Sequence, residues 1–370
     1  MDKANAALAD YLLDHGSTLH LVAHRVAPEF AANPRVNVHI VPRPAGSFAM
    51  AEFLIGWRGQ AVAKAVTGNR GDVRVVVNGG NCIWPGVNWV HCVHDSWPCF
   101  DDGAPAWFKL KNRAVKLWSR QRERASIRTA RVVVANSEKT RRELIDRVGV
   151  DPQRVHTVYL GSDSSWRPAT LTERQQARTW LGQADRRPLV AFVGALSHDQ
   201  NKGFDTLCTA WRRLCDLPEW DANLVVVGDG NAVGHWRRRI EQSGLTDRVK
   251  LLGFTDRVLD VLAAADLLVS PARYEAYGLN AHEAICRGVP ALVSRGAGIA
   301  ERYRSELKEM TLTDPNDVTE LRARLLDWRS GIDRWREAFA PLGCALRTYT
   351  WACMAEQIVR AAECHSAHVN

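Results

Sequence analysis

Short apolar runs alternate with longer amphipathic segments along most of the chain. The runs are rich in β-branched residues and contain no internal proline, which is typical of strands, whereas the longer segments have helical spacing. Strands are predicted at Leu19–Ala23, Val36–Val41, Val73–Asn78, Val87–Val93, Val132–Asn136, Val155–Tyr159, Leu189–Gly194, Leu224–Gly228, Val249–Gly253, Leu267–Ser270 and Ala291–Ser294. Their alternation with helices such as Thr206–Cys215 and Asn280–Arg287 predicts βα units and parallel sheets.

Glycine, serine, proline and polar residues interrupt this alternation near residues 161–187. The 370 residues are enough for two domains of roughly 100–200 residues each. We therefore predict an α/β protein with two Rossmann-like, doubly wound domains, residues 1–165 and 166–344, which face each other across a cleft. Ligands of such sheets bind outside the carboxyl ends of the strands, so we expect the chemistry there.

Charge and composition narrow the class of protein only slightly. The net charge of +8 suits anionic substrates, an anionic membrane surface or nucleic acid, but the chain has none of the sequence signatures of nucleic-acid binding. It contains no apolar run of about 18 residues that could span a membrane. Charged residues within the first sixteen predict an amphipathic helix rather than a secretion signal. The nine cysteines form no C-x-x-C pair, which indicates reduced thiols and a cytoplasmic protein.

The most informative motif is Ser270–Pro290, in which a predicted strand is followed by a loop and a helix that begins near Leu279. The backbone N–H groups of Tyr277, Gly278 and Leu279 are expected to point at an anion at the helix N-terminus. Glycine at 278 lets a phosphate approach closely. The carboxylates of Glu275 and Glu283 are suited to accept hydrogen bonds from sugar and ribose hydroxyls. The alternative is a plain βα unit with surface carboxylates.

A second motif, Phe192–Asp205, has the same strand, loop and helix arrangement. The strand ends at Gly194, and Lys202 and Gly203 open the helix, so a lysine and free amides are available to a diphosphate. A solvated surface lysine is the alternative. A third strand end, Val225–Gly230, carries a glycine-rich turn with Gly228, which is weak evidence on its own.

Together these motifs resemble the retaining family 4 (group 1) glycosyltransferases of GT-B fold. Glu275 and Glu283 have the E-x7-E spacing of that family, and the flanking Ser-Pro, Gly-Leu and Gly-Val-Pro match too. The resemblance implies that Glu283 holds the ribose of a nucleotide sugar and Glu275 contacts the transferred sugar. It also implies that Lys202 binds the diphosphate and that Gly194, Gly203 and Gly228 lie near the donor. The arginine that commonly follows the glycine is replaced here by Ala195.

The resemblance extends, less sharply, to the N-terminal half. A strand ends in Trp89–Trp97, where similar enzymes have a histidine that faces the donor sugar and the acceptor; we choose His94, with His91 second and Asp95 as a polar neighbour. A structural histidine is the alternative. Ser137 and Asp163 are carried as weaker candidate cleft residues. In this fold the last helix, within residues 345–365, crosses back to the first domain.

One departure concerns the start of the fold. Family members begin with a strand and a glycine-rich loop, whereas this chain begins inside what resembles the first helix and continues to Gly16 and the strand Leu19–Ala23. The strand that is lacking should be central in the N-terminal sheet. Either the start codon is assigned downstream of the true one, which we favour, or the chain is a truncated and inactive copy.

The resemblance implies transfer of a sugar from a nucleotide-sugar substrate to a sugar or lipid-linked acceptor with retention of anomeric configuration. No cofactor is expected. The chain has no Asp-x-Asp that would hold a metal ion, so we predict that lysine and amides stabilise the leaving diphosphate. A sugar-nucleotide epimerase and an inactive sugar-nucleotide binder are the alternatives.

The segment Trp107–Arg124 is predicted to form a basic helix with interleaved apolar residues. Such a helix could lie on the anionic inner face of a membrane while the enzyme reaches a lipid-linked acceptor. We favour the alternative, an ordinary helix between domains with a solvated basic face.

Overall fold

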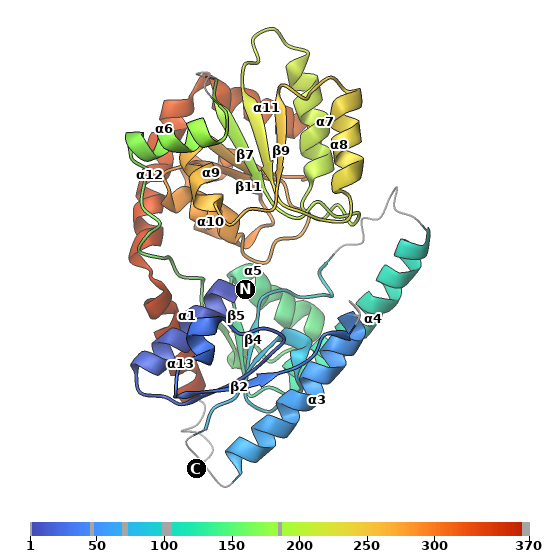
Figure 1. Ribbon diagram of the computed structural model, residues 1–370, viewed down its shortest axis with the longest axis vertical. Helices are drawn as coiled ribbons and strands as arrows, with labels where there is room; N and C mark the ends of the chain where they lie inside the picture. The colour runs from blue at the N-terminus through green and yellow to red at the C-terminus, as the bar shows by residue number, and fades with distance from the viewer. Residues whose placement is uncertain (1, 45–47, 69–72, 98–105, 184–186, 365–370) are drawn as a thin grey trace. The chain divides into compact units, whose positions relative to one another are not determined.

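The computed structural model describes residues 2–44, 48–68, 73–97, 106–183 and 187–364. Described residues of 1–97, 105–161 and 351–370 form a compact N-terminal unit, and described residues of 162–350 form a C-terminal unit (Figure 1). The chain thus passes between the units at 161–162 and again at 350–351. None of the helices in the described ranges combines the length and apolar character that a bilayer crossing requires.

The elements of the N-terminal unit follow the predicted alternation. Its helices and strands are α1 (Asp2–Asp14), β1 (Leu19–Ala23), α2 (Pro28–Ala31), β2 (Val36–Ile40), α3 (Phe48–Thr67), β3 (Val76–Asn78), the 3-10 turn η2 (Gly79–Asn81), β4 (Val87–Val90), α4 (Ala106–Thr129), β5 (Val132–Ala135), α5 (Glu138–Glu143), η3 (Leu144–Val148), η4 (Pro152–Arg154), β6 (Val155–Thr157) and α13 (Trp351–Cys364). The C-terminal helix α13 packs against α1 and β5 of this unit.

The strands of the N-terminal unit fall in two parallel sheets. One has the order β3-β4-β5-β6, and the other contains only β1 and β2. Residues of β4 and β5 are fully buried, as is usual for parallel strands that are covered on both faces, whereas β1 and β2 keep half-exposed and exposed side chains. Among the described residues, no strand pairs with the second edge of β1 or of β3.

The C-terminal unit contains one six-stranded parallel sheet. Its helices and strands are α6 (Leu171–Trp180), β7 (Leu189–Val193), α7 (Phe204–Cys215), β8 (Asn223–Val227), α8 (Val233–Gln242), β9 (Val249–Gly253), α9 (Val258–Ala264), β10 (Leu267–Ser270), α10 (Leu279–Cys286), β11 (Ala291–Ser294), η5 (Gly298–Arg302), η6 (Ser305–Met310), β12 (Thr311–Leu312), α11 (Val318–Ser330) and α12 (Ile332–Thr348). Helices α7 and α8 lie on one side of the sheet, and α9 and α10 lie on the other (Figure 1).

Almost every residue of β7, β8, β10 and β11 is buried, and this explains their continuous apolar character. The interrupted stretch near residues 161–187 is not all linker, because it holds helix α6. A capping box starts this helix: Thr170 accepts a hydrogen bond from the Glu173 backbone, and Glu173 accepts one from the Thr170 backbone. Only Ala177 of α6 is buried, so the apolar spacing that would reveal a helix is weak here.

Candidate functional site

The strand order of the C-terminal sheet, β12-β11-β10-β7-β8-β9, places its switch point between β7 and β10. From β7 the chain adds strands in one direction, and from β10 it adds them in the other. Ligands of doubly wound sheets bind in the crevice at such a point, outside the carboxyl ends of the strands. The two strongest sequence motifs, the loop after β7 and the loop after β10, are the two loops that border this position.

Close contact between the loops depends on glycine. Gly203 begins α7 with a φ of 69°, and a Cβ there would lie 1.9 Å from the carbonyl oxygen of Pro271 in the loop after β10. Gly228, with a φ of 145°, would place a Cβ 1.9 Å from the carbonyl oxygen of Gly194. Gly194 in turn donates its N–H to Val227 at 2.9 Å. These glycines therefore let the three loops touch, and their contact with a donor stays a prediction.

Lys202 and Glu275, which stand 73 residues apart in the sequence, form an ion pair with 2.7 Å between Nζ and Oε2. Their side chains are 30% and 17% exposed, so both are reachable from solvent. The structure thus brings together two of the residues that sequence predicted to act on a donor. An anionic ligand at this position competes with Glu275 for the ammonium of Lys202.

The helix α10 begins beside this pair. Gly278 is its N-terminal cap, has a φ of 107° and provides no side chain to satisfy the first amides of the helix. Among the described residues, no acceptor is found for the backbone N–H of Gly278 or Leu279. The backbone just before these two amides is held in place, because Ile299 donates its N–H to the carbonyl oxygen of Tyr277 at 2.6 Å. This helix start is therefore suited to bind an anion.

Glu283, the second carboxylate of the motif, is only 6% exposed on α10. Beside it, a buried chain of hydrogen bonds was not predicted from the sequence: the Tyr277 hydroxyl lies 2.6 Å from Nδ1 of His282, whose Nε2 lies 2.7 Å from the Ser162 hydroxyl. Burial lowers the pKa of His282 to about 3, so the imidazole is neutral. No sequence spacing connects Ser162 to His282, because 120 residues separate them.

Arg273, an arginine near the site, does not replace the one absent at Ala195. Its guanidinium holds both oxygens of Asp205 at 2.7 Å and donates to Asn316 at 2.7 Å. The side chain is only 6% exposed. It therefore ties the loop after β10 to α7 and is not presented to a ligand.

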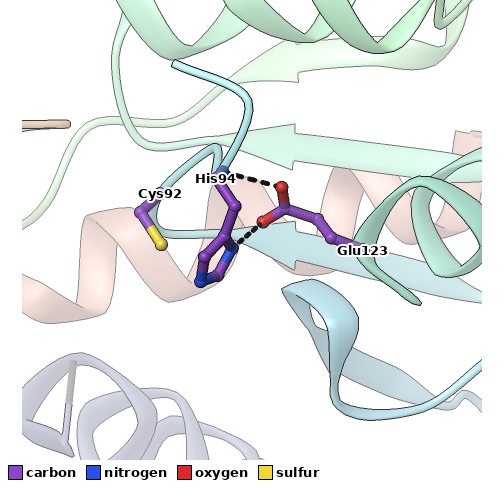
Figure 2. A group of neighbouring side chains, drawn as sticks. All are labelled: Cys92, His94 and Glu123. Atoms are coloured by element: carbon purple, nitrogen blue, oxygen red, sulfur yellow. Dashed lines mark hydrogen bonds and ion pairs between the residues drawn. The ribbon is translucent and has the colours of Figure 1, made fainter. Parts of the chain in front are cut away.

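In the N-terminal unit, His94 follows β4 and is bound to Glu123 of α4. Both oxygens of Glu123 are used: Oε1 lies 2.8 Å from Nδ1 of His94, and Oε2 accepts the His94 backbone N–H at 2.8 Å (Figure 2). Burial lowers the pKa of His94, but the hydrogen bond and charge of Glu123, with the charge of Glu52, outweigh burial and raise this pKa above its usual value. The sequence did not single out Glu123.

The other two candidates near β4 have structural partners. The ring of His91 packs on Trp89 with 4.4 Å between centroids, and burial lowers the pKa of His91 to about 3. Asp95 is paired with Arg124 at 2.6 Å and with Arg120 at 3.5 Å. Of the two histidines of this loop, His94 is therefore the one whose pKa lies above its usual value.

The structure shows local partners for two weaker candidates for cleft residues. Ser137 is fully buried, and its hydroxyl accepts the backbone N–H of Thr140 at 3.0 Å as the cap of α5. It acts on the helix and is not accessible to a ligand. Asp163 is exposed, and its carboxylate accepts the backbone N–H of Ser165 at 2.7 Å in a turn at the start of the C-terminal unit. Local turn structure accounts for Asp163 without a ligand.

Among the described residues, one group combines side chains that metals favour: Cys92, His94 and Glu123, with potential ligand atoms within 4.8 Å of one another (Figure 2). Both carboxylate oxygens of Glu123 are hydrogen-bonded to His94, one to its backbone N–H and one to its ring. We therefore interpret the group as a hydrogen-bonded pair beside a thiol. Independence of the reaction from metal stays a prediction.

Two family models match the chain. The Glycosyltransferase Family 4 model matches residues 4–166, and the Glycosyl transferases group 1 model matches residues 187–329. The 2-deoxystreptamine N-acetyl-D-glucosaminyltransferase of Streptomyces fradiae is 29% identical over 228 residues, which are 59% of this chain and 52% of the relative. The 2-deoxystreptamine glucosyltransferase of Streptomyces kanamyceticus is 31% identical over 202 residues, 54% of this chain and 51% of the relative. The chain thus spans about half the length of these curated relatives.

Solved structures are similar over nearly the whole chain. Sucrose-phosphate synthase from Thermosynechococcus elongatus has a TM-score of 0.74 at 20% identity and covers 98% of this chain and 92% of its own. Anabaena HepE, solved in complex with UDP-glucose, has a TM-score of 0.69 at 19% identity and covers 96% and 94%. At these identities the likeness shows the fold, and the predicted α/β architecture of two Rossmann-like domains is confirmed.

Proposed function

This chain belongs to the group 1, family 4 glycosyltransferases, which have the GT-B fold, and we propose that it transfers a sugar from a nucleotide-diphosphate sugar to an acceptor. The observation that carries the proposal is the pair of Lys202 and Glu275 beside the start of α10, at the switch point of the C-terminal sheet. A cation, a carboxylate and unpaired helix amides meet there, as a nucleotide sugar requires.

Each of these groups has a proposed part in the reaction. The bond between the anomeric carbon and the diphosphate oxygen breaks, and its electron pair leaves with the diphosphate. The ammonium of Lys202 and the amides of Gly278 and Leu279 stabilise the charge that develops there. Glu275 accepts hydrogen bonds from hydroxyls of the sugar, and Glu283 accepts them from the ribose. The ion pair with Glu275 keeps Lys202 in position until the donor arrives.

We propose that transfer retains the anomeric configuration and needs no metal ion. The acceptor oxygen attacks on the face from which the diphosphate leaves, and its proton passes to the departing phosphate oxygen. No protein nucleophile is required on this route. Lys202 and the amides supply the positive charge that a divalent cation would otherwise provide.

The experiment is a transfer assay with UDP-glucose, GDP-mannose and ADP-glucose, each with and without a mixture of sugar and lipid-linked acceptors. Release of nucleoside diphosphate should increase with acceptor, and the product should keep the anomeric configuration of the donor. Glu275→Gln should lower the rate by about 100-fold, because it removes a charged contact to the reacting sugar. The matched control Glu309→Gln, an exposed carboxylate of the same unit, should leave the rate unchanged.

The family match supports transfer over the alternatives, a sugar-nucleotide epimerase and an inactive binder. An epimerase would isomerise the sugar of the nucleotide sugar in the absence of any acceptor. That result, or binding without turnover of any donor, would contradict the proposal.

We also propose that the N-terminal unit contacts an anionic membrane surface, where a lipid-linked acceptor would lie. Seven of the twelve exposed large apolar side chains of the described residues are on α3 and α4, which pack against each other (Figure 1). They are Met50, Phe53, Trp57, Trp107, Leu110, Leu117 and Trp118. Basic residues such as Lys109 and Arg113 lie among them on α4. Apolar residues flanked by cations favour an anionic interface, and flotation with liposomes tests it.

A further inference from the structure

Glu123 is held in place from several sides before it meets His94. A Cβ at Gly80 would lie 3.2 Å from the Glu123 backbone, so α4 packs directly on the turn η2. Less than one helical turn further along α4, the Ser126 hydroxyl donates to Gly79 at 2.8 Å and accepts from the Asn88 amide at 2.9 Å. The Glu123 side chain is only 1% exposed. The backbone of α4 at Glu123 is therefore held by contacts other than those with His94, and its side chain is enclosed.

The two hydrogen bonds between these residues determine which ring nitrogen carries the proton. An ionised carboxylate only accepts hydrogen bonds. Since Oε2 accepts the His94 backbone N–H, and Oε1 of the ionised carboxylate can likewise only accept, Nδ1 must donate its N–H to Oε1. The neutral imidazole then carries its hydrogen on Nδ1 and keeps the lone pair on Nε2. Figure 2 shows Nδ1 turned toward the carboxylate and the other nitrogen on the far side of the ring.

We propose that Glu123 is a positioning residue that holds His94 in the Nδ1–H tautomer. Nε2 of His94 then accepts a hydrogen bond from a substrate hydroxyl, a role that rests on the proposed function. A histidine that is free to exchange tautomers would offer an N–H donor to that hydroxyl for much of the time. The two hydrogen bonds from Glu123 prevent this exchange of tautomers, because one carboxylate holds both the backbone N–H and the ring of His94.

The groups around His94 agree with this assignment. The His94 side chain is 30% exposed, whereas that of Glu123 is 1% exposed, so solvent reaches His94 and is excluded from Glu123. Glu52 of α3 and Lys116 of α4 act on the imidazole with opposite charge effects, and Asp95 is occupied by Arg124 and Arg120. Arg120 also donates to the carbonyl oxygen of His94 at 3.2 Å.

Glu123→Gln makes a specific test possible. The His94 backbone N–H can only donate, so the amide oxygen of glutamine must face it, and the amide NH₂ must then face Nδ1. Nδ1 becomes an acceptor and the proton moves to Nε2. In serine proteases, the corresponding Asp-to-Asn change traps the wrong tautomer and lowers kcat by about 10⁴.

The first measurement is ¹⁵N NMR of the histidine side chains at a pH where His94 is neutral, with His94→Gln to assign its signals. The wild-type protein should show Nδ1–H, and Glu123→Gln should show Nε2–H. Glu52→Gln, which removes a nearby carboxylate that makes no hydrogen bond to the ring, should keep Nδ1–H. An unchanged tautomer in Glu123→Gln would overturn the proposal. This result does not depend on transfer activity, so it is separate from failure of the proposed function.

The second measurement is the transfer assay on the same variants. Glu123→Gln should lower kcat by about 100-fold with little change in the donor KM, because the ground-state contacts to the nucleotide lie in the C-terminal unit. Glu123→Asp, which keeps the acceptor-only carboxylate, should recover part of this loss. A reversed tautomer together with unchanged kcat would show that the tautomer of His94 is irrelevant to transfer, and would overturn the proposal.

Discussion

His282 illustrates how a single buried residue connects the candidate donor loop to the segment where the chain passes between its units. The Ser162 hydroxyl donates to the carbonyl oxygen of Leu346 at 2.7 Å, so it must accept from Nε2–H of His282, and Nδ1 then accepts from the Tyr277 hydroxyl. These hydrogen bonds can all form in the directions given only while the imidazole is neutral, because a protonated Nδ1 could no longer accept from the Tyr277 hydroxyl. The loop that carries Gly278 is thereby fixed to the C-terminal end of α12.

This arrangement makes stability depend on pH in a predictable direction. The pKa of His282 is lowered to about 3 in the folded state, whereas the unfolded value is about 6.5. Below pH 6.5 the unfolded chain binds a proton that the folded chain refuses, so stability falls on acidification until about pH 3. Between pH 7 and 5 the contribution of His282 should fall by about 2 kcal/mol.

The measurement is urea unfolding at pH 7 and pH 5 of the wild-type protein and of His282→Gln. The variant is destabilised but lacks the titrating group, so the difference in free energy between the two proteins should shrink at pH 5. A difference that stays constant between the two pH values would show that His282 does not titrate as described.

At the scale of elements, most of the fold and half of the candidate site could be predicted from the sequence. The strands of a parallel sheet can be recognised in the sequence as apolar runs, because they are buried on both faces. The motifs at residues 192–205 and 270–290 begin at the ends of two such strands. Since β7 and β10 are neighbours in the sheet, their loops bring Lys202 and Glu275 to 2.7 Å. Glu123 could not be predicted, because no local pattern links a residue of a basic helix to a histidine 29 positions earlier.

Short or polar elements were also not predicted, because they lack a periodic apolar pattern. Strand β12 has two residues, and α6 buries a single alanine, so neither produces a periodic apolar signal. The predicted strands also extend beyond the observed ones at some ends, as at Val87–Val93, where β4 stops at Val90 and a loop carries the chain to His94. Pattern specifies which element forms, but tertiary hydrogen bonding decides where the element ends.

The apolar surface of α3 and α4 gives an element-scale prediction. Wild-type protein should float with liposomes that contain anionic lipid, and flotation should decrease strongly when Trp107→Ser and Leu110→Ser are combined with Lys109→Gln and Arg113→Gln. The apolar changes remove area that the membrane would bury, and the neutralised cations remove about 1 kcal/mol each of attraction.

The control for this experiment is the double change Arg322→Gln and Arg324→Gln on α11, which removes the same charge from the C-terminal unit. It should leave flotation unchanged. Equal flotation of the α4 variant and the wild-type protein would show that the surface serves another purpose.

At the scale of the whole molecule, the candidate site residues are divided between two units, each of which contains parallel sheets. The C-terminal unit contains a six-stranded sheet and the candidate donor site, and the N-terminal unit contains His94, in the loop after β4, and Glu123 of α4. The family match and the similarity to solved GT-B structures extend over both units. We therefore propose that the C-terminal unit binds the nucleoside diphosphate of a donor through Lys202, Glu283 and the start of α10.

Calorimetric titration of the purified chain with UDP, GDP and ADP, without added metal, tests that claim most directly. One nucleotide should bind, and Lys202→Ala and Glu283→Ala should each weaken it by about 10- to 100-fold, the effect of a lost charge-assisted hydrogen bond. The matched controls Lys308→Ala and Glu309→Ala should bind like the wild-type protein. Binding that is unaffected by changes at Lys202 and Glu283, or no binding of any of the three nucleotides by the folded chain, would contradict the account.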